Sequence, residues 1–204
     1  MKKIYIVLSS GNTVPKRVYR VLTDCAYDHV SVAFHENLPV MYSFAKSQLD
    51  VALVGGFLAE YPSRFLADGG SIPVKVFGIE VTEQEYMRVR DVIRRMMTHP
   101  QIYTYNVFDK AASVFGTSFK IRRSYTDLAF VCRLLRLGEI KSIKELEFVL
   151  DPYLEYEGNF NDKVAEIDGR HGAEYFKKTI PAEAMIKTAA YTIKLLGKRV
   201  IQGK

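Results

Sequence analysis

The sequence predicts an α+β protein in which an antiparallel sheet packs on helices that lie to one side. Residues 29–34 and 40–45 are short, apolar segments separated by a five-residue polar turn, which is the pattern of a β-hairpin. Several later segments carry helix-capping signals. The predicted strands and helices are grouped along the chain and do not alternate strictly, and this grouping favours an antiparallel sheet.

The strand predictions rest on alternating or β-branched segments that end at turn residues. In the hairpin, Val30 and Val32 share one face with Phe34, whereas His29 and Ser31 share the other. The Gly-Gly-Phe segment at 55–57 lies in an apolar stretch and predicts a close approach of two backbones. The other predicted strands are residues 3–9, 74–81 and 153–158.

The helix predictions rest on apolar spacing and on residues that begin or end a helix. Thr82 with Glu85, and Ser142 with Glu145, form capping boxes at two helix starts. Glycine is the expected stop of two others. The predicted helices are residues 15–22, 82–97, 106–115, 124–137 (ended by Gly138), 143–150 and 181–196 (ended by Gly197).

Length and composition predict one globular domain, residues 1–160, followed by an extension, residues 161–204, with a single helix. The longest uncharged apolar stretch, Val51 to Ala59, is far shorter than the ~20 residues of a membrane span, so we expect no transmembrane segment. Cys25 and Cys132 lack metal-ligand spacing and fit a reducing compartment, which favours a cytoplasmic location. No metal site and no cofactor is predicted.

The net charge of +6 is unevenly distributed. Residues 110–144 contain eight basic and two acidic side chains, whereas residues 145–168 contain eight acidic side chains and one basic one. The two blocks either complement each other within one fold or leave a basic surface for an anion or a nucleic acid. The sequence lacks the interleaved aromatic-glycine motif of an RNA-binding sheet, which disfavours a nucleic-acid partner.

The C-terminal helix is basic and amphipathic. Met185, Ala189 and Ile193 recur at helical spacing, and lysines occupy other positions. Such a helix docks onto its own domain, docks onto a second copy of the chain to form a homo-oligomer, or lies on a membrane surface. We expect one of the two docking arrangements.

Five segments follow one another in a characteristic order: residues 27–34, 41–44, 55–57, 103–106 and 125–131. This order resembles the circularly permuted NlpC/P60 branch of the papain-like cysteine peptidase superfamily, and in particular a bacterial group within it. The resemblance covers residues 3–158 and implies a permuted papain-like domain. It implies a cysteine nucleophile at the start of the packed helix, a histidine base on the first hairpin strand and a polar orienting residue on the next strand.

Position by position, His29 matches the base and Ser43 falls near the orienting position. Asp127 stands where the family has its cysteine, and a carboxylate is a poor nucleophile for acyl transfer. It does suit the first turn of a helix, and an ion pair between Asp127 and His29 would hold the site together without catalysis. The tyrosines of the same segments, Tyr27, Tyr42 and Tyr125, are the candidate ligand-binding residues.

Neither cysteine takes the place of the missing thiol directly. Cys132 lies five residues after Asp127, roughly 140° around the helix, and is expected in the core. Cys25 precedes His29 by four residues, roughly 13 Å in an extended chain, and would need a turn to reach it.

Three functional hypotheses follow. The first is a catalytically degenerate papain-like domain that binds an amide- or ester-bearing ligand, such as a cell-wall peptide fragment or an acyl group. The second is an active cysteine hydrolase or acyltransferase that pairs His29 with Cys25. The third is binding of an anion or nucleic acid through the basic segment 110–144.

Overall fold

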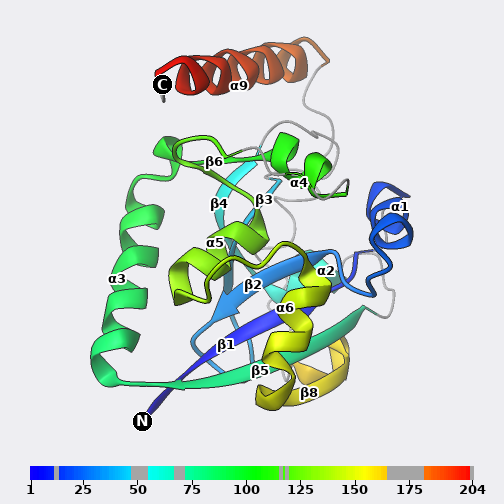
Figure 1. Cartoon of the computed structure of the whole chain (residues 1–204), viewed down its shortest axis with the longest axis vertical. Coiled ribbons are helices and arrows are strands. Elements are labelled where there is room, and N and C mark those ends of the chain that lie inside the picture. The colour runs from blue at the N-terminus through cyan, green and yellow to red at the C-terminus, as the bar shows by residue number, and fades with distance from the viewer. Residues whose placement is uncertain are drawn as a thin grey trace.

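A computed structural model describes residues 1–11, 14–46, 55–66, 72–114, 117, 120–164 and 182–202. Its centre is a six-stranded sheet with the order β4-β3-β2-β1-β5-β8, and every neighbouring pair of strands is antiparallel (Figure 1). The predicted α+β class with an antiparallel sheet is therefore confirmed. The strands are β1 (Lys2–Ser9), β2 (His29–Ala33), β3 (Met41–Lys46), β4 (Gly55–Glu60), β5 (Pro73–Val81) and β8 (Leu154–Asn159).

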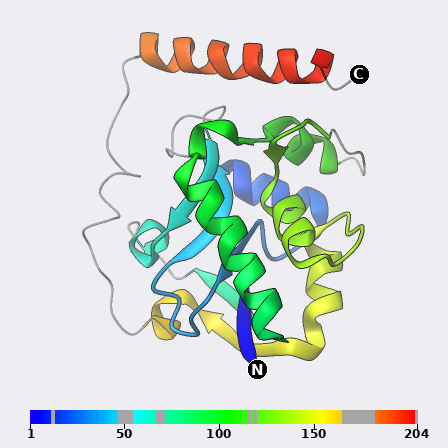
Figure 2. The ribbon, with the colours of Figure 1, turned by 90° about the vertical axis from the view of Figure 1, so that its left-hand side faces the viewer.

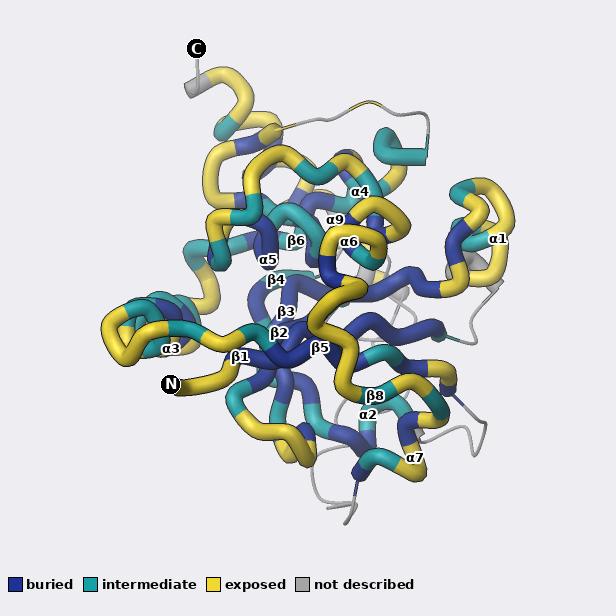
Figure 3. The backbone as a smooth tube through the Cα atoms, turned by 60° about the horizontal axis from the view of Figure 1, so that its bottom comes forward, coloured by how far each residue is buried: buried dark blue, intermediate teal, exposed yellow. Residues whose placement is uncertain are grey.

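Helices cover both faces of this sheet, not one face as the sequence predicts. Figure 3 shows α2 and α7 on one side and α5 and α6 on the other. The second layer was missed because α2 and α7 are only one turn or so long and carry little periodicity. The helices are α1 (Val14–Thr23), α2 (Pro62–Leu66), α3 (Glu83–Thr98), α4 (Val107–Ser113), α5 (Asp127–Leu135), α6 (Ile143–Leu150), α7 (Phe160–Lys163) and α9 (Ala182–Gln202), with 3-10 turns at Pro100–Ile102 and Asp151–Tyr153.

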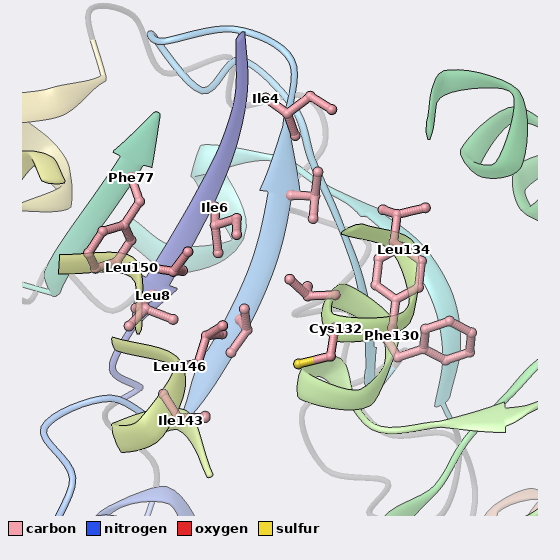
Figure 4. Packing of buried hydrophobic residues seen from close by; sticks show 14 of the residues in the cluster. Ile4, Ile6, Leu8, Phe77, Phe130, Cys132, Leu134, Ile143, Leu146 and Leu150 are labelled. Atoms are coloured by element: carbon pink, nitrogen blue, oxygen red, sulfur yellow. The ribbon is translucent and has the colours of Figure 1, made fainter. Parts of the chain in front are cut away.

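The central strand β1 is buried on both sides. Ile4, Ile6 and Leu8 face a core shared with α3, α5 and α6, part of which Figure 4 shows. Tyr5 and Val7 face a smaller core with α2 and α7. Because successive side chains of a strand point to opposite faces, this unbroken apolar run fits a strand that is covered twice.

Several local predictions are confirmed. The amide of Glu85 donates to Thr82 Oγ1 at 3.1 Å, and the amide of Glu145 donates to Ser142 Oγ at 3.0 Å, as the two capping boxes require. The close approach at the glycine pair is also present. A Cβ atom at Gly55 would collide with the backbone of Ala45 and with Tyr105.

The helix predicted over 124–137 starts later, at Asp127. Ser124 and Tyr125 form β7, which pairs in parallel with β6 (Thr104–Tyr105), and Thr126 is the N-cap. The helix ends at Leu135 because Arg136 adopts a left-handed conformation, with φ of 56°.

The last helix, α9, runs through the expected stop at Gly197 and continues to Gln202. Residue 181, the predicted first residue, lies outside the described residues. In Figures 1 and 2, α9 crosses one end of the molecule, beyond β6 and α4. No helix in the described part of the chain combines the length and apolarity needed to cross a bilayer.

Candidate functional site

His29 opens β2 and meets the first residue of α5. Its Nδ1 lies 3.0 Å from Asp127 Oδ2, so the contact between the early strand and the helix start is present. Its Nε2 lies 2.8 Å from Glu60 Oε2, a carboxylate on β4. An imidazole whose two nitrogens both face carboxylates has two acceptors for its N–H groups, which favours the doubly protonated cation.

Asp127 reaches β2 because the sheet is open there. The pairing of β2 with β3 covers only Val32 and Ala33. Nearer the start of the strand, the amide of Val30 donates to Asp127 Oδ2 at 3.2 Å. The carboxylate thus accepts an amide hydrogen bond at a point where β3 does not pair with β2.

Lys110 on α4 supplies a cation to the same carboxylate. Its Nζ lies 2.9 Å and 3.2 Å from the two oxygens of Asp127 and donates to the carbonyl of Asp28 at 3.0 Å. The Asn106 side chain caps α4 and fixes the turn that presents Lys110. The ammonium group also lies 4.7 Å from the centre of the Tyr19 ring.

Glu60 continues the chain of charges on the other side of His29. Ser43 Oγ donates to Glu60 Oε2 at 2.5 Å, and Arg64 Nε on α2 lies 3.1 Å from Oε1. We call Lys110, Asp127, His29, Glu60 and Arg64 the ion network. Its charges alternate in sign, which is how a folded chain tolerates buried ions.

The network lies almost wholly out of water, since the side chains of Asp127 and Glu60 are each 1% exposed. Burial disfavours their charged forms, but the charges of Lys110 and His29 hold the pKa of Asp127 well below its usual range. Likewise, burial is outweighed by His29 and Arg64, which lower the pKa of Glu60 to about 2.

The cations respond in the opposite direction. Burial opposes protonation of His29, yet Glu60 and Asp127 together raise its pKa above the ordinary value of 6.5. Burial also opposes the charge on Lys110, and the Asp127 carboxylate more than reverses this, so the pKa of Lys110 is raised. The charged forms of His29, Lys110, Asp127 and Glu60 therefore stabilise one another.

Neither thiol takes part in this arrangement. Cys25 and Cys132 belong to the apolar core on the α5 side of the sheet. Burial raises the pKa of the Cys25 thiol, and it raises that of Cys132 to about 12. Because thiolates are the reactive form, neither sulfur has the environment of a nucleophile.

The other expected site residues divide between core and surface. Ser43 reaches His29 only through Glu60, so the orienting contact expected of the serine is made by the carboxylate instead. Tyr27 is buried in the core, and Tyr42 stacks on Phe57. Tyr125, by contrast, lines a pocket.

Sequence reasoning missed Glu60, Lys110 and Arg64. Glu60 is the first charged residue after the long apolar stretch, and an isolated carboxylate at the end of a buried strand was the available signal. Arg64 follows it at the i+4 spacing of an ion pair. Lys110 carried no signal beyond its membership of the basic segment.

A pocket of about 700 Å³ opens beside the ion network, between α4, the start of α5 and residues 138–141. We call it the basic pocket. The apolar part of its wall is formed by Tyr125, Leu128 and Ile140. Its acidic residues are Asp109 and Glu139. Its basic residues are Lys110, Lys120, Arg122, Arg123, Arg133 and Lys141.

The basic pocket and the ion network share Lys110, whose side chain lines the pocket while its ammonium group binds Asp127. Ser124 also lines the pocket, and its buried hydroxyl has no hydrogen-bond partner among the described residues. Arg133 lies 5.7 Å from the Tyr125 ring centre, so its guanidinium is held at the pocket wall.

Comparisons with protein-family models, with curated proteins and with solved structures find no match to this chain.

The Asp127→Asn variant is expected to lose about 3–5 kcal/mol of unfolding free energy, because it leaves Lys110 and His29 buried without their shared anion. Urea denaturation measures the difference. The matched control is Asp91→Asn on α3, which removes an exposed ion pair with Arg94 and should cost less than about 1 kcal/mol. Equal losses in the two variants would contradict a structural role for the network.

Stability is expected to be highest between pH 4.5 and pH 6.5, the ordinary pKa values of Glu60 and His29. Above 6.5 the unfolded chain releases a proton that folded His29 keeps, so the unfolding free energy falls as pH rises. Below 4.5 the unfolded chain takes up a proton at Glu60, whereas the folded protein keeps this carboxylate ionised down to about pH 2. The unfolding free energy therefore falls again as the pH decreases.

Chemical denaturation across this pH range measures the profile. In His29→Gln, the decline above pH 6.5 should flatten. His99→Gln, at the exposed end of α3, should keep it. A decline that is identical in wild type and His29→Gln would show that His29 is not its source.

Proposed function

We propose that this chain is a binding module without thiol catalysis, and that the basic pocket is its ligand site. The proposal follows the resemblance to permuted NlpC/P60 domains, with the nucleophile position taken by a carboxylate. The ligand class is an anion that carries phosphate or carboxylate groups and an apolar portion.

The observation that carries the proposal is the juxtaposition of the closed ion network with the basic pocket. A papain-like base must accept a proton from a thiol, but both nitrogens of His29 are bound to carboxylates. The pocket that adjoins the helix start is lined by six basic and two acidic side chains. Such a surface concentrates anions and pairs with them directly.

The apolar wall supports a ligand with more than a charged group. Tyr125, Leu128 and Ile140 offer contact surface to an acyl chain or to the side chains of a short peptide. A carboxylate-terminated peptide fragment or an acyl phosphate-type molecule combines both features. Amide- and ester-bearing ligands therefore remain within the proposed class when they also carry a negative charge.

The competing hypotheses have weaker support. An active hydrolase that uses Cys25 needs a thiolate beside His29, whereas Cys25 is a buried core residue with a raised pKa. A nucleic-acid site has the basic side chains but shows no exposed row of aromatic residues along the pocket rim for stacking bases, as far as the described residues show.

The variant Arg122→Glu/Arg133→Glu is expected to weaken binding of inorganic pyrophosphate at least about tenfold, because it reverses two charges at the pocket. Isothermal titration calorimetry at fixed ionic strength measures the affinity. The control Arg94→Glu/Arg95→Glu makes the same charge change on the exposed face of α3. Equal weakening in both variants would indicate a general charge effect and would contradict a pocket site.

The double variant Lys110→Ala/Asp127→Cys tests the papain-like geometry. It places a thiol at the first position of α5 beside His29 and removes the lysine that separates this position from the pocket. At pH 6 its alkylation by iodoacetamide should exceed that of Cys25 and Cys132 at least about tenfold, because the imidazolium and helix start stabilise the thiolate.

Mass spectrometry of the labelled peptides gives the rates of all three thiols within one sample. Adding His29→Gln should abolish the advantage of the introduced thiol. Uniform labelling of the three thiols would indicate an unfolded variant, and slow alkylation of the introduced thiol in a folded protein would contradict the family geometry.

A further inference from the structure

The C-terminal helix α9 has an exposed apolar stripe that the proposed function does not use. Ile186, Ile193 and Val200 recur every seven residues, which places them in one row along the helix. Their exposed fractions are 69%, 50% and 40%, and exposed Ala190 and Gly197 lie between them in the same row. We call these five residues the apolar stripe.

A different face of α9 holds the helix to the domain. Thr192 and Leu196 are buried, and the Arg199 guanidinium donates to Thr104 Oγ1 at 2.5 Å and to the carbonyl of Ile102 at 2.8 Å. At ~100° per residue this docked face lies about 110° around the helix from the apolar stripe. Among the described residues the stripe is exposed, so it can contact something outside the domain while the helix stays attached.

A row of lysines runs along the other flank of the stripe. Lys187 and Lys194 each follow a stripe residue by one position, and Lys198 continues the row. In the described residues of α9 the only acidic side chain is Glu183, which pairs with Lys187 at 2.7 Å. The exposed faces of α9 thus combine an apolar stripe with an excess of positive charge.

We infer that α9 lies on the surface of an anionic lipid bilayer, with the apolar stripe inserted among the acyl chains and the lysine row at the headgroups. Isoleucine and valine gain from burial in hydrocarbon, and lysine stems extend their ammonium groups to phosphates. Lysines near an anionic surface add electrostatic attraction to that apolar gain.

The charge pattern disfavours a second copy of the chain as the occupant. A symmetric antiparallel pairing of two stripes would bring the two lysine rows together, and like charges across such an interface are destabilising. A nucleic acid would pair with the lysines but offers no apolar surface for Ile186 and Ile193. An anionic bilayer satisfies both features.

Co-sedimentation of the full chain with lipid vesicles tests the inference. Wild type should bind vesicles of phosphatidylcholine with about 30% phosphatidylglycerol and bind pure phosphatidylcholine weakly. Ile186→Ser/Ile193→Ser/Val200→Ser should lower the partition coefficient at least about tenfold, because three apolar side chains no longer insert. Lys187→Glu/Lys194→Glu/Lys198→Glu should remove the preference for anionic vesicles.

The matched control is Val18→Ser/Val21→Ser/Leu22→Ser, which alters three comparably exposed apolar residues on α1. It should bind as wild type does, and the stripe variant should still bind inorganic pyrophosphate, which separates this inference from the proposed function. Thermal unfolding of every variant establishes that it is folded.

Three results would overturn the inference. One is absence of wild-type binding to anionic vesicles, and another is equal loss of binding in the stripe variant and the α1 control. The third is a dimer in light scattering that only the stripe variant dissociates.

Discussion

The Asp127 carboxylate is the contact on which the arrangement of the remaining elements depends. It accepts hydrogen bonds from the His29 ring, from the amide of Val30 and from the Lys110 ammonium group. Those groups belong to β2 and α4, so one buried anion joins the start of α5 to the open part of the sheet and to a second helix. An anion removed from water in this way is stable only with all its partners present, which makes the position of α5 highly specific.

The same contact also limits the chemistry of this site, because it occupies His29. A thiol at the start of α5 would need His29 to be accessible and to have one free nitrogen, whereas the ion network occupies both. Lys110 belongs to both the ion network and the basic pocket, because its ammonium group neutralises Asp127 and its side chain lines the pocket. The proposed binding surface therefore adjoins the buried carboxylate at the start of α5.

The sequence predicts those features that depend on local patterns. The hairpin, the two capping boxes and the meeting of His29 with Asp127 are all present in the structure. Glu60 was missed because its place beside Ser43 depends on the pairing of β3 with β4, and the chain between these strands carries no signal of register. The late start of α5 was missed because it depends on the pairing of β7 with β6, about 20 residues earlier in the chain.

The position of β1 in the middle of the sheet has a consequence for synthesis on the ribosome. Strands β1 to β4 emerge first and bring His29 and Glu60 together, but the Lys110 and Asp127 groups that complete their charges are translated 50 residues or more after Glu60. The second edge of β1 also cannot pair until β5 has been translated. The nascent sheet therefore carries an incomplete set of buried ions and an uncovered apolar face until the later helices arrive, and this interval is when the chain is most exposed to aggregation.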